Sequence, residues 1–250
     1  MKRFFLPCAF ALALSLPFSV LRAADAPAPA DTPGAMATVS GTPSPELQKK
    51  MSDVLDSYGN GRYDEALTRL ADAEKLKPND PELINLEGAI YVKQEKWDKA
   101  GDAFTRALAI NPKYFPAQFN TGEILYLQKK YPDARDVFTK LQSDQPKNEL
   151  LKYKIFLTYL MEGNDTEAKA RLDKFDFVAD TPAYYYASAA WYYKHNDVTQ
   201  AESYIASSLQ IFPPQANNIF AESLIDAGWL KRKSPAEQAA VGKPALVPTK

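Results

Sequence analysis

Few side chains in this sequence are of the types that perform acid–base, nucleophilic or metal chemistry. His195 is the only histidine and Cys8 is the only cysteine among the 250 residues. A zinc site would depend on carboxylates around a single imidazole, which is unusual for structural or catalytic zinc. The segment YYKHND around His195 is typical of a solvated turn between helices. We therefore predict that the protein is not an enzyme and that it has no catalytic residues, metal or cofactor.

Two other segments resemble ligand loops only superficially. GNGR, at residues 59–62, is typical of a turn and not of a nucleotide-binding loop, and the whole chain has only 10 glycines. EGNDTEAKA, at residues 162–170, lacks the alternating ligands and the closing glutamate of a calcium-binding loop. Both segments are predicted to connect helices.

The N-terminus has the layout of a secretory signal peptide. Lys2 and Arg3 precede an apolar run over residues 4–20, and Ala23 ends the segment before acidic, Pro/Ala-rich sequence begins. We predict cleavage after Ala23 and export to the periplasm, with release to the medium as an alternative. A retained membrane anchor is a further alternative, which two prolines within the short apolar run disfavour.

Charge and hydropathy exclude two classes of partner. Removing residues 1–23 removes the cysteine and three cations, so the formal charge changes from 30 − 31 = −1 to 27 − 31 = −4. A mildly acidic chain without a basic block is not expected to bind nucleic acid, because such binding needs clustered Lys and Arg. No later apolar run is long enough to insert into a membrane.

Composition divides the chain into four segments. Residues 1–23 are the predicted signal peptide, and residues 24–44 are rich in Ala, Pro, Thr and Gly, so we predict a disordered spacer. Residues 45–230 contain nearly all the aromatic side chains and are predicted to fold. Residues 231–250 return to the composition of the spacer and are predicted to be a disordered tail.

Alanine, proline and large apolar residues recur across the folded segment with a period of about 34 residues. The alanines are spaced by 34, 34, 34 and 33 residues and lie at Ala66, Ala100, Ala134, Ala168 and Ala201. Four residues after each alanine stands a large apolar residue: Leu70, Phe104, Phe138, Leu172 and Ile205. Prolines at matching offsets are Pro78, Pro112, Pro146 and Pro213. Concordant units at one period indicate a repeat architecture.

Each unit is predicted to consist of two helices. In the second unit, Ile84, Gly88 and Tyr91 mark one helical face, and Ala100 and Phe104 mark the next. A capping residue followed by proline predicts helix starts, at Ser44-Pro45, Asp80-Pro81 and Thr181-Pro182. The small residue at the eighth position of a unit lets helices approach closely, and the proline at its end stops the second helix.

These residues resemble the tetratricopeptide repeat family. The second unit carries the resemblance at Ile84, Gly88, Tyr91, Ala100, Phe104, Ala107 and Pro112. The third matches at Gly122, Tyr131, Ala134, Phe138 and Pro146, and the fifth at Ala189, Tyr192, Ala201, Ile205, Ser208 and Pro213. The pattern departs at Val54 and Phe156, which replace the small residue, and at Asp180, which replaces the proline.

The resemblance implies an all-α, right-handed superhelical solenoid of about five helix pairs, closed by a C-terminal capping helix. Repeats of this kind bury their open faces on their neighbours, so the last one needs a cap. We predict that the cap buries apolar residues and turns Glu222 and Asp226 outward. Its apolar residues are Ile219, Phe220, Leu224, Ile225, Trp229 and Leu230.

In the resembled family, the first helix of each unit lines a concave groove. Carried onto this chain, the family's groove positions are Asn85, Phe119, Glu123, Tyr126, Tyr153, Leu157, Tyr186, Tyr193 and Lys194. Tyrosine gives a large contact area at a small entropic cost and ends in a polar group, so a tyrosine-rich stripe suits recognition. The alternative is that aromatics at helical spacing only pack the core.

Three functions fit this sequence. The favoured one is an exported interaction protein that binds a peptide or helix of another envelope or secreted protein in its groove. The second is an assembly scaffold, or a homo-oligomer, that acts through its outer face. The third is a glycan-binding envelope protein, since tyrosines also stack on sugars.

Overall fold

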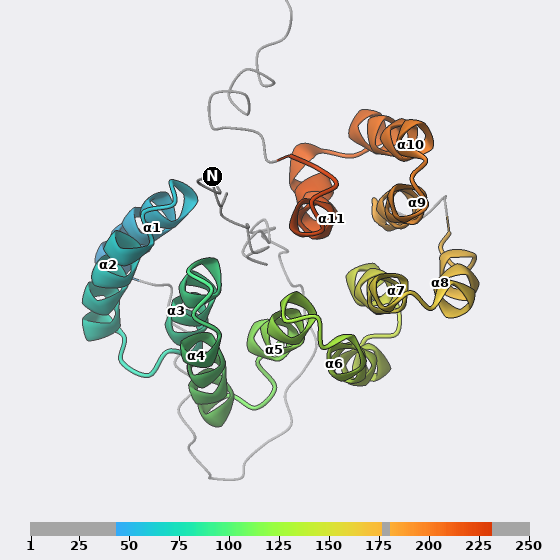
Figure 1. Cartoon of the computed structure of the whole chain (residues 1–250). Coiled ribbons are helices and arrows are strands. Elements are labelled where there is room, and N and C mark those ends of the chain that lie inside the picture. Colours follow the sequence, from blue (N-terminus) through green and yellow to red (C-terminus); the bar gives the residue numbers. More distant parts are fainter. Residues whose placement is uncertain (1–43, 177–180, 232–250) are drawn as a thin grey trace, which may run out of the picture. The chain divides into compact units, whose positions relative to one another are not determined.

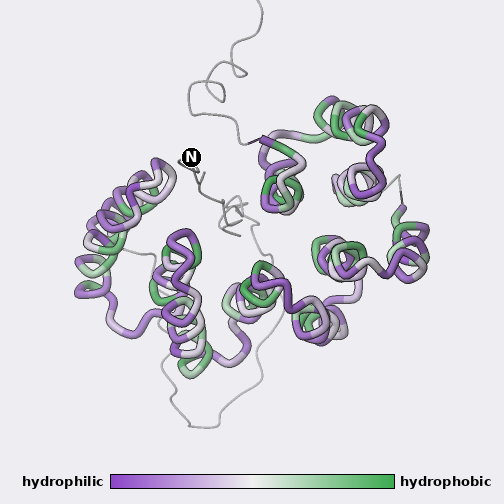
Figure 2. Tube along the Cα trace, in the orientation of Figure 1, coloured by the Kyte–Doolittle hydropathy of each residue, from purple (hydrophilic) through white to green (hydrophobic). Residues whose placement is uncertain are grey.

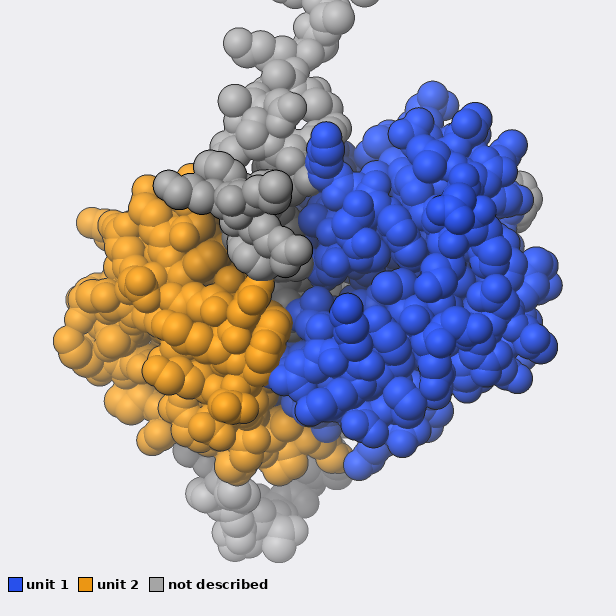
Figure 3. All heavy atoms as spheres, in the orientation of Figure 1, with its two compact units in different colours: residues 1–11, 115–250 blue, residues 12–114 orange. Residues whose placement is uncertain are grey.

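The computed structural model describes residues 44–176 and 181–231. Over these two ranges the chain forms eleven helices and no strand, which confirms the all-α helical-repeat fold. The predicted signal peptide, nearly all of the predicted spacer and tail, and Asp180 lie outside the described residues. The chain divides into two compact units (Figure 3). We call residues 44–114 the N-terminal unit and residues 115–231 the C-terminal unit.

The N-terminal unit consists of two helix pairs in which each helix packs against the next. Its helices are α1 (Pro45–Gly59), α2 (Tyr63–Leu76), α3 (Pro81–Lys93) and α4 (Trp97–Ile110). The predicted caps are confirmed: the side chain of Ser44 accepts a hydrogen bond from the Leu47 amide at 3.2 Å, and that of Asp80 accepts one from the Glu82 amide at 2.7 Å. Each cap satisfies an amide that has no partner within its helix.

The C-terminal unit consists of three helix pairs and a closing helix. Its helices are α5 (Phe115–Leu127), α6 (Tyr131–Asp144), α7 (Glu149–Glu162), α8 (Asp165–Leu172), α9 (Ala183–Lys194), α10 (Val198–Ile211) and α11 (Pro214–Asp226). α9 begins at Ala183, one residue later than the capping pattern predicted, and Pro182 occupies the capping position without a side-chain bond. Figure 2 shows apolar residues interleaved with hydrophilic ones on these helices.

A glycine on the first helix of a pair makes room for a phenylalanine ring on the second. A Cβ at Gly122 would lie 2.6 Å from Cε1 of Phe138, closer than real Cβ contacts come, and Gly88 faces Phe104 in the same way. Both rings are almost fully buried. The small residue is therefore needed for close packing, but the group that lies against it is the phenylalanine ring of the same pair, not the backbone of the partner helix as predicted.

Two repeats combine a larger eighth residue with a leucine in place of that phenylalanine. Val54 and Leu70 share the buried cluster of the N-terminal unit, and Phe156 and Leu172 share that of the C-terminal unit. All four side chains are buried, so both repeats still fill their interior although a larger residue replaces glycine.

The fourth pair has a short second helix. α8 has 8 residues, whereas α6 and α10 each have 14. Gly163 ends α7 in the left-handed region with φ of +87°, and Asn164 caps α8 by accepting from the Glu167 amide. Phe156 contacts the ring of Phe175 edge-on, with centroids 6.1 Å apart. The core of this pair is thus completed by a residue that follows α8.

Candidate functional site

The closing helix of the C-terminal unit lies on the side of the first helices. α11 packs beside α9 and lies on the same side of the repeats as α7, while α6, α8 and α10 lie on the other side (Figure 1). We call inner face the surface of α5, α7 and α9 that carries Glu123, Tyr126, Tyr153, Lys154, Tyr186 and Tyr193.

The predicted groove residues fall in both units. Asn85 lies on α3 in the N-terminal unit and is buried. The other eight lie on α5, α7 and α9, as the repeat register predicts. Seven of these eight are buried, and only Lys194 is partly exposed. Tyr153 and Leu157 have no exposed surface, and Tyr186 exposes 2%. That they contact a partner stays a prediction, and in this conformation they are covered.

Phe220 of α11 contacts two of the buried tyrosines. Its ring meets that of Tyr153 edge-on, with centroids 5.4 Å apart, and stacks on Tyr186 at 6.1 Å. The Tyr153 hydroxyl also donates a hydrogen bond to the Phe220 carbonyl at 3.3 Å. Burial raises the pKa of Tyr153 well above its ordinary value and that of Tyr186 as well.

A buried charge pair lies beside these rings. Lys154 Nζ is 2.6 Å from Glu123 Oε2, and the two side chains expose 4% and 9% of their surface. The same ammonium donates to Ser223 Oγ of α11 at 2.7 Å. It also lies 5.4 Å from the centroid of the Tyr126 ring, a distance at which a cation is attracted to the ring face. Three helices therefore meet at one cation.

Two polar atoms near this pair have no hydrogen-bond partner among the described residues. They are the Tyr126 hydroxyl and Asp226 Oδ1, and both are buried. Burial, together with Tyr153, Glu123 and Asp226, raises the pKa of Tyr126 well above its ordinary value. The prediction that Asp226 turns outward was wrong for this carboxylate oxygen, because α11 lies across the inner face and not only at the end of the stack.

α11 is fastened at both ends. At its start, Asn217 is buried, donates to the Phe212 carbonyl at 2.8 Å and accepts from Ser208 Oγ at 2.6 Å. At its end, Gly228 adopts φ of +77°, and the Trp229 amide donates back to the Leu224 carbonyl at 2.9 Å. This turn places the Trp229 ring on Tyr193, stacked with centroids 5.9 Å apart.

Sequence reasoning missed Lys154 and Ser223 as parts of this surface. Lys154 stands in the segment LLKYKIFLTYL, where a cation among apolar residues is the only signal. Nothing in the sequence pairs it with Glu123, 31 residues earlier, or with Ser223, 69 residues later. Phe220 was expected to be buried, but its contacts with Tyr153 and Tyr186 were not predicted.

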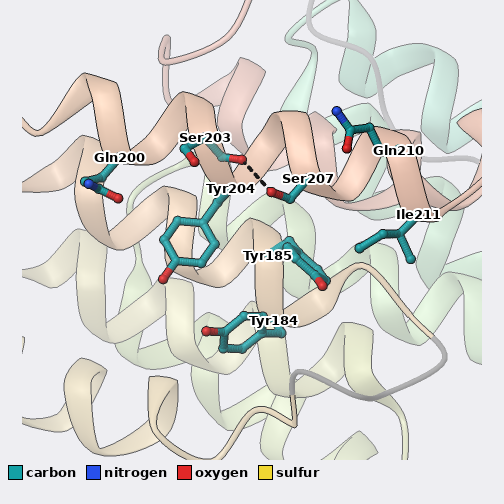
Figure 4. A pocket seen from close by; sticks show the side chains of 8 residues that line it. All are labelled: Tyr184, Tyr185, Gln200, Ser203, Tyr204, Ser207, Gln210 and Ile211. Carbon is teal, nitrogen blue, oxygen red and sulfur yellow. Dashed lines mark hydrogen bonds between the residues drawn. The ribbon is translucent and has the colours of Figure 1, made fainter.

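A second concave feature lies between α9 and α10. It is a pocket of about 460 Å³, lined by eight uncharged residues (Figure 4). Tyr184, Tyr185 and Tyr204 form its aromatic wall, and serine and glutamine side chains and Ile211 complete it. The Tyr184 and Tyr204 rings meet edge-on at 5.9 Å. Burial raises the pKa of Tyr204 to about 12.

His195 links two repeats at an exposed position. Its Nδ1 lies 2.7 Å from the Trp191 carbonyl oxygen and its Nε2 lies 3.0 Å from Asp165 Oδ2. These two acceptors raise its pKa, the backbone carbonyl most strongly. The residue follows α9 directly, so the predicted turn is confirmed. Within the described ranges, no three His, Cys, Asp or Glu side chains gather into a possible metal site.

Comparisons with known proteins agree with the repeat pattern. A tetratricopeptide repeat family model matches residues 54–115 and 85–149. The human protein O-mannosyl-transferase TMTC1 is 32% identical over 111 residues, which are 43% of this chain and 12% of that protein. The chain thus spans about an eighth of the length of this relative.

Solved structures of repeat proteins are similar to this fold. A thermophilic TPR protein from Thermus thermophilus matches with a TM-score of 0.56 at 22% identity, covering 72% of this chain and 99% of that one. A tetratricopeptide repeat protein from Parabacteroides merdae matches with a TM-score of 0.58 at 16% identity, covering 71% of each. PilF from Pseudomonas aeruginosa matches with a TM-score of 0.51 at 17% identity, covering 73% and 88%.

Among the helices of the described residues, none has the length and apolar character needed to cross a membrane. The period of 34 residues, the glycine–phenylalanine packing, the family match and the structural likeness agree. Residues 54–149 therefore carry tetratricopeptide repeats, and the described part of the chain has the fold of tetratricopeptide repeat proteins.

Proposed function

We propose that this chain is an exported, non-catalytic interaction protein that binds a helix of another envelope or secreted protein on its inner face. The repeat family supports a role in protein–protein interaction. The observation that carries the finer proposal is the way α11 sits: Phe220, Ser223 and Trp229 find aromatic and hydrogen-bonding partners there. A surface that accepts one amphipathic helix has the chemistry to accept another.

Export rests on the sequence alone. The basic start, the apolar run and Ala23 support a cleaved signal peptide. Fractionation of the native host, followed by N-terminal sequencing of the protein, tests it. We expect a mature chain that begins at Ala24 in the exported fraction, and an intact N-terminus in the cytoplasm would contradict the proposal.

Photocrosslinking in the native host tests the inner-face assignment. A crosslinking side chain is placed at Lys194, which is partly exposed beside the inner face, and a matched one at Leu209, which is 50% exposed on α10. We expect adducts with a discrete exported protein from position 194 and not from position 209. Adducts from position 209 alone would favour the scaffold that acts through its outer face.

The pocket between α9 and α10 supports a second candidate function, the binding of a neutral glycan. Tyrosine faces with hydroxyl and amide side chains around them offer stacking and hydrogen bonding without charge. Titration with neutral cell-wall oligosaccharides, followed by tyrosine fluorescence, tests it. We expect saturable quenching that Tyr204→Ala removes and Leu209→Ala retains; an unchanged signal in the unsubstituted chain would exclude this candidate.

A further inference from the structure

We propose that α11 is an internal ligand of the inner face, and that a partner helix displaces it. The displacing helix carries an aromatic side chain at the position of Phe220 and a short hydroxyl side chain at the position of Ser223, three residues later. At the position of Asp226, a further three residues on, it has no acid. This inference rests on the proposed function, because it names the class of partner that the inner face takes. It also gives the face a closed state.

The spacing of the contacts defines what the inner face recognises. Phe220 and Ser223 are three residues apart, so they lie on one side of α11. Phe220 meets Tyr153 and Tyr186, while Ser223 accepts from Lys154 at 2.7 Å. Two anchors at this spacing are the pattern by which a groove binds an amphipathic helix.

The chemistry under α11 differs from that of a permanent core. Lys154 and Glu123 lose their water when α11 covers them, and burying a charge pair costs free energy that their attraction does not always recover. When α11 leaves, both groups regain water. The free-energy difference between the closed and open states is therefore smaller than it would be if α11 covered an apolar surface of the same size.

α11 is also an imperfect occupant. Asp226 Oδ1 and the Tyr126 hydroxyl are buried without a partner in the described part of the chain. Asp226 also adds a second acid to a place where Lys154 already pairs with Glu123. A helix without an acid at this position leaves no unpaired carboxylate, so it competes with α11 successfully.

A tether keeps α11 close after it leaves. Asn217 bonds to Ser208 and to the Phe212 and Pro213 carbonyls, so the start of α11 is fastened to the end of α10. A tethered occupant acts at an effective concentration on the order of millimolar. The apparent affinity for a partner is lowered by the small fraction of chains that are open.

The test measures binding of a fluorescent peptide with the sequence of residues 213–231 to the full chain. Phe220→Ala in the chain weakens the internal occupant and leaves the inner face unchanged. Asn218→Ala, at an exposed position of α11, is the matched control. We expect Phe220→Ala to bind the peptide at least tenfold more tightly than the unsubstituted chain, and Asn218→Ala to bind it equally.

Changes in the peptide test the recognition pattern. We expect a peptide with Asp226→Asn to bind the Phe220→Ala chain more tightly than the native peptide, and one with both Phe220→Ala and Ser223→Ala to lose binding. Equal affinity of the native peptide for the Phe220→Ala and unsubstituted chains, or failure of the folded variant to bind it, would overturn the proposal. A chain dimer that the peptide converts to monomers would also overturn it, since the occupant would then be α11 of a second copy.

Hydrogen exchange on the unsubstituted chain keeps the test decisive if Phe220→Ala does not fold. We expect the amides of α11 to exchange at least tenfold faster than those of α9 and α10, because α11 opens by itself. If the amides of α11 are protected as well as those of α9 and α10, α11 is a permanent part of the core, and the proposal that a partner helix displaces it is refuted. A different result separates this inference from the proposed function. If the peptide binds but no partner crosslinks at Lys194 in the host, the proposed function is refuted, while the displacement of α11 is still supported.

Discussion

The C-terminal unit holds its helices together through two kinds of contact. Within a pair, the ring of Phe138 lies against Gly122 in an apolar, close-packed interior. Between α11 and the inner face, Phe220 is apolar too, but it is flanked by Lys154, Glu123 and Ser223. In the first kind of contact, all of the buried surface is apolar and its burial stabilises the fold. In the second, the cost of removing water from Lys154 and Glu123 offsets part of the stabilisation that Phe220 provides. The difference separates the contacts that build the repeat from those that can exchange.

The largest expected effect comes from removing a ring of the first kind. Phe138→Ala leaves a cavity in a close-packed interior, and we expect it to lower the free energy of unfolding by about 3–5 kcal/mol. Urea denaturation monitored by circular dichroism measures this. Leu209→Ala, at a half-exposed position, is the control and is expected to change little. A loss below about 1 kcal/mol for Phe138→Ala would break the distinction between the two contacts.

The charge pair should behave differently. Lys154→Met removes the cation that pairs with Glu123. Removing one partner of a charge pair that stays buried costs about 3–5 kcal/mol of stability. We expect a smaller loss of the unfolding free energy, together with faster hydrogen exchange of α11, because Glu123 regains water when α11 lifts. The double variant Lys154→Met, Glu123→Leu should restore slow exchange. If Lys154→Met lowers the free energy of unfolding by the full amount of about 3–5 kcal/mol while the amides of α11 stay protected from hydrogen exchange, this charge pair belongs to the permanent core.

The contact between Gly122 and the Phe138 ring tests how closely the interior is packed. We expect Gly122→Ala to cost about 1–3 kcal/mol, because the added Cβ meets the Phe138 ring at 2.6 Å. Adding Phe138→Leu should recover part of this loss, as the pairing of Val54 with Leu70 indicates. Thermal or urea unfolding of both variants measures it, and a double variant less stable than the single one would contradict the volume argument.

The smallest effect concerns His195, which lies outside both kinds of contact. Its folded-state pKa is raised, so its contribution to stability is complete below the unfolded pKa of about 6.5 and is lost as pH rises through the folded value. Because the pair with Asp165 is exposed, we expect less than about 1 kcal/mol. The difference in unfolding free energy between the unsubstituted chain and His195→Gln should fall between pH 5 and pH 8. A difference that does not vary over this range would show that neither the Trp191 carbonyl nor Asp165 favours the protonated imidazole in the folded chain.

The repeat could be predicted from sequence because its signals are local and periodic. Ala100, Phe104 and Pro112 recur in other units, and each repetition supports the same helix pair. Helix starts at Ser44 and Asp80 follow from capping chemistry, which needs only neighbouring residues. The inner-face positions on α5, α7 and α9 follow from register once the repeat is known.

By itself, then, the sequence determined the helical repeat, its register, the small residue at the eighth position and the apolar side of the closing helix, all of which depend on residues within about one repeat of each other. Only the tertiary structure decided that α11 lies across the inner face and that Lys154 joins Glu123 to Ser223. Those contacts join residues up to 69 positions apart, and no periodic pattern specifies them. They depend on where the chain turns after α10, and Asn217 fixes that turn through hydrogen bonds that only the folded chain forms.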